Sequence, residues 1–249
     1  MTDFNKIINL VLESTLQTLQ MVSLSTLFSV MLGLPLGILL CISDPQSGIK
    51  PRRVLYQVLT RIVNALRSFP FIILMVLLFP LSRLIVGTSI GTAATIVPLS
   101  IAAAPFVARV IETALKEVDL GVIQAARAMG STTMQIILKV LLPEAMPSLV
   151  DGVTLTVINL IGYSAMAGAL GGGGLGDLAI RYGYQRFRPE VMAIAVVVIL
   201  LMVELIQFAG TFVSRRISAR RYGIKKAEHI RLFSLVEPLF FPFGVAFVY

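Results

Sequence analysis

Long apolar stretches, separated by shorter polar and basic ones, set the pattern of this chain. Apolar residues dominate 15–42, 88–110, 148–170 and 191–213. About 20 such residues are enough for a helix to cross the hydrocarbon core of a bilayer. We therefore predict a membrane-spanning helix in each of the four ranges.

A fifth span is predicted over 54–82, although its pattern is composite. Residues 69–81 are apolar but too short to cross a bilayer alone. The residues before them are amphipathic, and their polar face carries Arg53, Gln57, Arg61 and Asn64. We expect the two parts to form one span whose polar side faces protein, with a bend at Pro70.

The longest polar interruption, 112–147, has the pattern of two short helices. Val118 to Met129 are good helix formers, and Gly130 is placed to end that helix with a positive φ. Thr132 and Gln135 have the spacing of a capping box for a second helix. That helix would have one apolar face, made of Met134, Ile137, Leu138 and Leu141. Pro143 and Pro147 are expected to stop it or to start the next helix.

Composition supports an all-α integral membrane protein. Of the 249 residues, 57% are hydrophobic and only 14% charged, with a mean hydropathy of +0.90, whereas soluble domains are about a quarter charged. The net charge of +8 does not indicate nucleic-acid binding, because the basic residues flank the apolar stretches. With one cysteine and one histidine, no metal site is expected.

The basic residues also predict the orientation. With five spans, the segments 43–68, 109–147 and 214–226 share one side and hold fifteen Lys and Arg, against five on the other side. Because the richer side is usually cytoplasmic, we expect the N-terminus outside, the C-terminus inside and the loop 112–147 in the cytoplasm. Residues 1–222 would then form the membrane domain. Residues 223–249 would form a tail at the interface or, as an alternative, a sixth span.

The loop contains a motif. Gln124-Ala125-Ala126, Gly130, Val140 and Leu142-Pro143 have the spacing of the E-A-A…G…I-x-L-P motif and depart from it at Gln124 and Val140. In this the chain resembles the membrane subunits of binding-protein-dependent ABC importers. The resemblance implies a type I importer permease fold, with a cytoplasmic coupling helix that docks on an ATPase subunit. The coupling residues it implies are Gln124, Ala125, Ala126, Arg127, Met129, Gly130 and Pro143.

Further strings, among them 67–74, 85–91, 103–106, 162–166 and 206–210, are similar to the membrane subunit of bacterial methionine importers over roughly residues 10–220. This resemblance implies a homodimer in the bacterial inner membrane that imports L-methionine, and D-methionine as well. The implied partners are two ABC ATPase subunits and a methionine-binding protein, periplasmic or lipid-anchored. ATP and Mg²⁺ would bind to the ATPases, and no cofactor to this chain.

For the substrate pathway we single out Tyr163 and Met166, which share a helical face. Packing of both against another helix is the alternative. Gly162 and Gly168 are candidates for gating or close packing. The run Gly171–Gly176 is interpreted as a flexible break where the fourth span ends.

Other classes of function are possible alternatives for such a chain. The chain lacks the Walker A, H-E-x-x-H and G-x-S-x-G motifs, so no enzyme chemistry is predicted and ATP hydrolysis is assigned to a partner. An ABC permease for another amino acid or a quaternary amine would look nearly the same. An ATP-independent secondary transporter is a weaker alternative, with Glu204 as the intramembrane charge that could couple it to an ion gradient. A structural membrane scaffold would leave the loop motif unexplained.

Overall fold

The regular secondary structure of the described residues is helical. The computed structural model describes the backbone of residues 2–240 and the side chains of residues 5–219; the tail predicted for 223–249 lies beyond the described side chains. The long helices are α1 (Thr2–Ser43), α2 (Arg53–Ser68), α3 (Phe71–Val86), α4 (Thr92–Lys116), α8 (Met146–Ala169) and α10 (Pro189–Phe240). Shorter helices are α5 (Leu120–Ala128), α6 (Thr133–Ile136), α7 (Leu142–Glu144) and α9 (Gly174–Asp177). Two π-helical segments complete them, Ile137–Leu141 and Leu178–Tyr184.

Four helices are long and apolar enough to cross a membrane, and the α2–α3 pair would make a fifth span. This confirms the predicted fold class. The helices differ from the predicted spans at their ends, because polar residues continue a helix as readily as apolar ones. α4 runs on to Lys116, so the loop starts after it rather than at residue 112. α10 extends well beyond 191–213.

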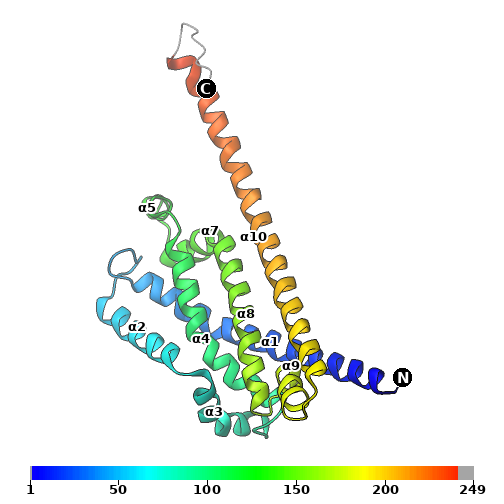
Figure 1. Ribbon diagram of the computed structural model, residues 1–249. Coiled ribbons are helices and arrows are strands. Elements are labelled where there is room, and N and C mark those ends of the chain that lie inside the picture. The colour runs from blue at the N-terminus through cyan, green and yellow to red at the C-terminus, as the bar shows by residue number, and fades with distance from the viewer. Residues whose placement is uncertain (1, 241–249) are drawn as a thin grey trace.

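Close helix packing organises the bundle. α1 crosses behind α4 and α8 (Figure 1) and packs mainly against α4. Gly33 and Gly37 of α1 make this possible, since a Cβ at Gly37 would lie 2.6 Å from the carbonyl oxygen of Ala108 and one at Gly33 2.7 Å from Val107. Small residues at such positions let helix backbones approach in a membrane.

The predicted bend at Pro70 is confirmed. Phe69 and Pro70 have extended backbone, and the axes of α2 and α3 differ by 102°. The expected orientation of α2 is not found within this chain, because Arg53, Gln57 and Arg61 on its polar face are exposed. α2 packs instead through a third face, between its charged and apolar sides, that carries Tyr56, Leu59 and Val63.

The glycine-rich break after α8 is confirmed, but it is tightly packed rather than flexible. The N–H of Gly174 donates to Gln17 Oε1 (2.8 Å), and the N–H of Leu175 donates to Thr18 Oγ1 (2.9 Å). Gly171, Gly173 and Gly174 have positive φ, which other residues rarely adopt. These two hydrogen bonds therefore join the start of α9 to α1.

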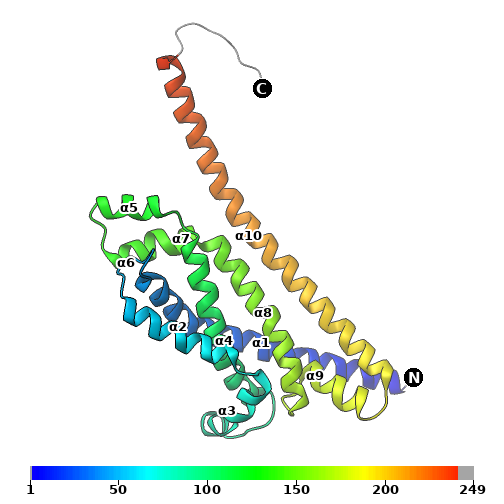
Figure 2. The ribbon, with the colours of Figure 1, turned by 60° about the vertical axis from the view of Figure 1, so that its left-hand side comes forward.

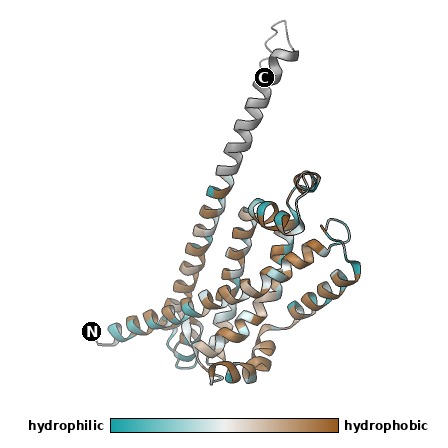
Figure 3. Ribbon diagram, turned by 180° about the vertical axis from the view of Figure 1, so that it is seen from behind, coloured by the Kyte–Doolittle hydropathy of each residue, from teal (hydrophilic) through white to brown (hydrophobic). Residues whose placement is uncertain are grey.

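Hydrophobic residues predominate along the described part of α10 (Figure 3). Leu200, Leu201, Leu205 and Phe208 are exposed there, as expected for side chains in contact with lipid tails. Glu204 lies on the same helix and is also exposed. Among the described residues it has no ion-pair partner.

Candidate functional site

The predicted loop folds as a compact helical element at one end of the bundle, in which α5 lies beside the continuous helical stretch that runs from α6 to α7 (Figure 2). Asp119 caps α5 by accepting a hydrogen bond from the N–H of Gly121 (2.7 Å). The helix ends at Ala128, and Gly130 follows with a φ of +80°. The N–H of Gly130 donates to the carbonyl of Arg127 (2.9 Å). The predicted C-terminal glycine is thus confirmed.

The capping box is confirmed as well. The hydroxyl of Thr132 accepts from the N–H of Gln135 (3.3 Å), whose side chain accepts from the N–H of Thr132 (2.8 Å). Both bonds use donors that the first turn of a helix leaves unpaired.

The predicted apolar face of this helix is half wrong. Ile137 and Leu141 are buried, but Met134 and Leu138 are 63% and 56% exposed. The chain becomes π-helical over Ile137–Leu141, where the N–H of Leu142 donates to the carbonyl five residues back. The extra residue in this turn rotates the following side chains away from an α-helical pattern.

The inner side of α5 is firmly held. Ile123 and Ala126 are buried in a cluster with Ile49, Leu115 and Ile136. The guanidinium of Arg127 also donates a hydrogen bond to the carbonyl of Ile49, in the loop between α1 and α2. α5 is therefore fixed to both that loop and the end of α4.

The outer side of the same element is exposed and largely apolar. Gln124 and Ala125 are exposed, and Pro143 lies half-buried at the start of α7. We call the exposed apolar side chains of this element the coupling surface: Leu120, Val122, Met129, Met134 and Leu138. Exposed apolar side chains grouped in this way are typical of a surface that binds a partner.

A charge network that the sequence analysis missed lies beside this element. Glu112 of α4 is 1% exposed. It accepts from Arg109 (2.6 Å), from Lys116 (2.7 Å) and from the hydroxyl of Tyr56 on α2 (3.0 Å). The signal in the sequence was the spacing of Arg109, Glu112 and Lys116, which places all three on one helical face.

The network extends to the end of α1. Lys116 Nζ lies 2.8 Å from Asp44 Oδ2, just beyond α1. Burial alone would raise the pKa of Asp44, but hydrogen bonds from Lys116, from the N–H of Gln46 and from Ser47 outweigh it and hold this pKa below its usual value. The network joins the α1–α2 loop, α2 and α4 at the end of the bundle that carries α5.

Several contacts bring the basic segments to this end. Lys116 and Arg127 bond to the loop after α1. Ser214 of α10 donates to Asp151 Oδ2 (2.9 Å) at the start of α8. The ends of α1, α4 and α5, the start of α8 and residue 214 therefore lie together, as the distribution of basic residues predicted.

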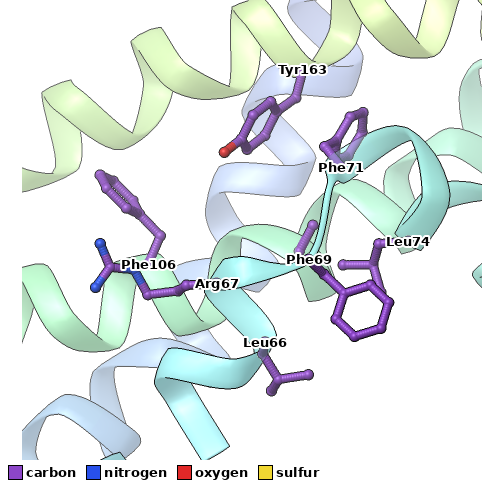
Figure 4. A pocket seen from close by; sticks show the side chains of 8 residues that line it. Leu66, Arg67, Phe69, Phe71, Leu74, Phe106 and Tyr163 are labelled. Carbon is purple, nitrogen blue, oxygen red and sulfur yellow. The ribbon is translucent and has the colours of Figure 1, made fainter.

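Tyr163 lines a cavity of about 250 Å³ near the bend between α2 and α3 (Figure 4). Its ring stacks on Phe71, with ring centroids 4.6 Å apart. Met166 is 46% exposed and is not part of this lining, so the chain does not bring the two predicted residues into one cavity.

Gly162 and Gly168, the two glycines near Tyr163 and Met166, differ in how closely their surroundings pack against them. Gly162 faces open space, whereas a Cβ at Gly168 would lie 2.3 Å from the backbone nitrogen of Asp177. Gly168 thus serves close packing against α9. Within residues 5–219, no group of three or more His, Cys, Asp and Glu side chains could hold a metal ion.

The chain was compared with known proteins. A family model described as "Binding-protein-dependent transport system inner membrane component" matches residues 33–220. A "Probable D-methionine transport system permease protein MetI" of Vibrio cholerae is 49% identical over 212 residues, covering 85% of this chain and 94% of that protein. The "D-methionine transport system permease protein MetI" of Escherichia coli K12 is 52% identical over 159 residues, covering 64% of this chain and 73% of that one.

Solved structures agree. A chain of the inward-facing "MetNI methionine ABC transporter" superimposes with a TM-score of 0.83 and 48% identity, covering 85% of this chain and 98% of that chain. An amino acid ABC transporter matches with a TM-score of 0.68 and 21% identity, covering 86% and 97%, which supports the fold alone. The family model covers most of the chain, and this protein belongs to the family of binding-protein-dependent transport system inner membrane components.

Proposed function

We propose that this chain is the membrane subunit of an ATP-driven importer of methionine. Relatives named as D-methionine permeases share about half of its residues along most of both chains, and the methionine transporter structure has the same fold. The observation that carries the proposal is the two-sided α5 element. Its inner side is packed and hydrogen-bonded to the bundle, and its outer side presents the exposed coupling surface.

The coupling surface would dock on a separate ATPase subunit. An exposed α-helix with apolar side chains such as Met129 suits a groove on a partner protein. Because Ile123, Ala126 and Arg127 fix α5 to the α1–α2 loop and to α4, a displacement of α5 would be passed to those helices. A loosely held loop would absorb it.

The assembly would contain two copies of this chain and two ATPases, with ATP and Mg²⁺ bound to the ATPases. ATP binding would close the ATPases and open the permease to a methionine-binding protein on the opposite face. Hydrolysis would then reset the pathway, so that access alternates between the two sides. Residues Gln124, Ala125, Met129 and Pro143 belong to the proposed docking region.

The same contacts support an orientation in the membrane. The end of the bundle with α5 also carries the basic segments, and basic residues concentrate on the cytoplasmic side. The coupling surface would therefore face the cytoplasm, where ATP is found, and the N-terminus would lie outside.

Uptake by reconstituted vesicles tests the proposal. The chain, its co-purifying ATPase and the binding protein would be combined, and labelled methionine uptake would be measured with each component omitted in turn. Uptake that requires both ATP and the binding protein is expected. ATP-dependent uptake of a different solute would refute the substrate alone, and ATP-independent uptake would refute the role of the coupling surface.

A further inference from the structure

The cavity at the α2–α3 bend has the size and walls of a site for a small molecule. Its volume is about 250 Å³, below the roughly 300–1,000 Å³ of pockets for drug-sized ligands. Phe69, Phe71, Phe106 and Tyr163 give it aromatic walls, contributed by α4, α8 and the bend itself. A free amino acid is a molecule of suitable size.

Arg67 is the charged residue in this lining. Its guanidinium lies 5.8 Å from the centre of the Phe106 ring, and among the described residues no carboxylate lies within ion-pairing distance of it. Arg109, about two turns before the end of α4, is paired with Glu112. A charged residue within a span is costly and usually marks a substrate or ion pathway.

α3 begins at the same cavity. Phe71 is the first residue of α3 and lines the cavity together with Leu74. The N–H of Leu74 donates to the carbonyl of Pro70 (3.1 Å). The N–H groups of the three residues before Leu74 have no acceptor within the helix. Broken helices in transporters direct such N-termini at anionic groups of the substrate.

The opposite wall suits an apolar, polarisable side chain. Figure 4 shows the stacked rings of Phe71 and Tyr163 facing the cavity from α3 and α8, with the Tyr163 hydroxyl directed toward the side on which Phe106 lies. Thioether sulfur makes favourable contacts with aromatic rings. Arg67 and this aromatic stack occupy different parts of the cavity lining (Figure 4).

Arg67 also lines a second cavity, of about 260 Å³, on the α5 side of the first. Its other lining residues include Arg109, Thr113, Glu117 and Ser148, which lie toward the end of α4 and the start of α8. A ligand leaving the first cavity in that direction would pass Arg67. The residue therefore stands at the junction of two spaces along α4 and α8.

We propose that Arg67 binds the α-carboxylate of the transported amino acid, while Phe71 and Tyr163 contact its side chain. The inference rests on the proposed function and assigns a substrate subsite within each permease chain. A guanidinium can donate two parallel N–H hydrogen bonds to the two oxygens of a carboxylate. The ammonium group of a lysine cannot reproduce this bidentate geometry.

The test uses the absence of tryptophan from this chain. A Phe106→Trp variant places a fluorophore beside Arg67 in the assembled complex, and the complex without it supplies the background of the partner subunits. Methionine and methionine amide, which lacks the carboxylate, are titrated in detergent or nanodiscs. Methionine is expected to bind at least tenfold more tightly than the amide.

Adding Arg67→Gln should weaken methionine binding about tenfold and leave the amide unchanged, so that the two ligands bind alike. Arg67→Lys should restore part of the preference. Arg61→Gln is the matched control, because Arg61 is an exposed arginine of the same helix that lines neither cavity. It should change neither titration.

The outcomes separate the subsite from the proposed function. Equal weakening of both ligands by Arg67→Gln, an unchanged methionine affinity, or no methionine-dependent signal in the Phe106→Trp complex would each overturn the subsite. Methionine uptake by vesicles of the unsubstituted complex is measured in parallel. Uptake with any of these three results would leave the proposed function standing, and binding through Arg67 without uptake would refute the proposed function alone.

Discussion

Lys116, the last residue of α4, forms an ion pair with Asp44, the first residue after α1, with 2.8 Å between Nζ and Oδ2. The pair joins two helix ends that are 72 positions apart in the chain. Because Lys116 also bonds to Glu112 and to the hydroxyl of Tyr56, the contact connects three elements next to α5. This corner is the most highly charged buried part of the described bundle.

The Asp44–Lys116 pair should make stability depend on pH. Since the native pKa of Asp44 is depressed below its ordinary value of 3.8, its ionised form stabilises the fold above that pH. The contribution is lost as pH falls through the native pKa. The Tm of the wild type should therefore exceed that of Asp44→Asn at pH 7, and the difference should shrink below about pH 3.8. A difference that is independent of pH would contradict the prediction.

Glu112→Gln should destabilise the protein substantially. The change would leave Arg109 and Lys116 without their shared, buried carboxylate, and breaking a buried pair costs roughly 3 kcal/mol or more. Partial exposure of the two cations (24% and 29%) favours the lower end. Thermal unfolding in detergent should show a Tm lowered by several degrees. Glu190→Gln, at an exposed site, should leave the Tm within a degree.

Gly130→Pro should abolish uptake without preventing membrane insertion. Proline would force φ from +80° to about −65° and remove the N–H that donates to Arg127, so α5 would lose its end. Gly130→Asn is the matched control, because asparagine tolerates positive φ. It should retain most of the uptake. Uptake rates and the amount of assembled complex would be measured together, and wild-type uptake by Gly130→Pro would refute the proposed role of α5.

Gly37→Ala should weaken the packing of α1 on α4. The added Cβ would lie 2.6 Å from the carbonyl oxygen of Ala108, so one backbone must move. Gly162→Ala meets nothing within 4 Å, and should be neutral or stabilise the helix by up to about 1 kcal/mol. A lower Tm for Gly37→Ala alone is expected in detergent. Equal Tm values for the two variants would contradict the prediction, because they would show that α1 and α4 accommodate the added Cβ without loss of stability.

Gly162→Ala also tests the expected gating role of that position. A variant that is as stable as the wild type but takes up methionine more slowly would assign Gly162 to movement or to contact with another chain. Unchanged uptake would remove it from the site. Initial uptake rates at saturating binding protein would distinguish the two results.

Features determined by local chemistry could be predicted from the sequence. Gly130 and the Thr132–Gln135 box each depend on residues within one turn, and the bend at Pro70 follows from proline geometry. The π-helical turn at Ile137–Leu141 was missed because its register depends on how Ile136 and Ile137 pack against α4, which no local pattern reveals.

The candidate site likewise combines residues that could be predicted from local sequence with contacts that depend on distant parts of the chain. Tyr163 was predicted from its own chemistry, but its partners Arg67 and Phe71 come from a segment nearly 100 residues earlier. The bonds from Lys116 to Asp44 and from Arg127 to the carbonyl of Ile49 likewise join distant parts of the chain. Spacing on one helix indicates which residues share a face, but it does not indicate what lies opposite.

The hydrogen bonds between the glycine-rich break and α1 also bear on how the chain acquires its structure. Gln17 and Thr18 bond to residues 157 positions later, so this junction cannot form until most of the chain has been synthesised. Loop closure over such a distance is slow. Until then the side chains of Gln17 and Thr18 can bond only within α1, to Glu13 and to the carbonyl of Ser14. The junction between α1 and α9 therefore forms late in biogenesis. Nascent chains that stop before Gly174 should be recognised by membrane proteases as incomplete.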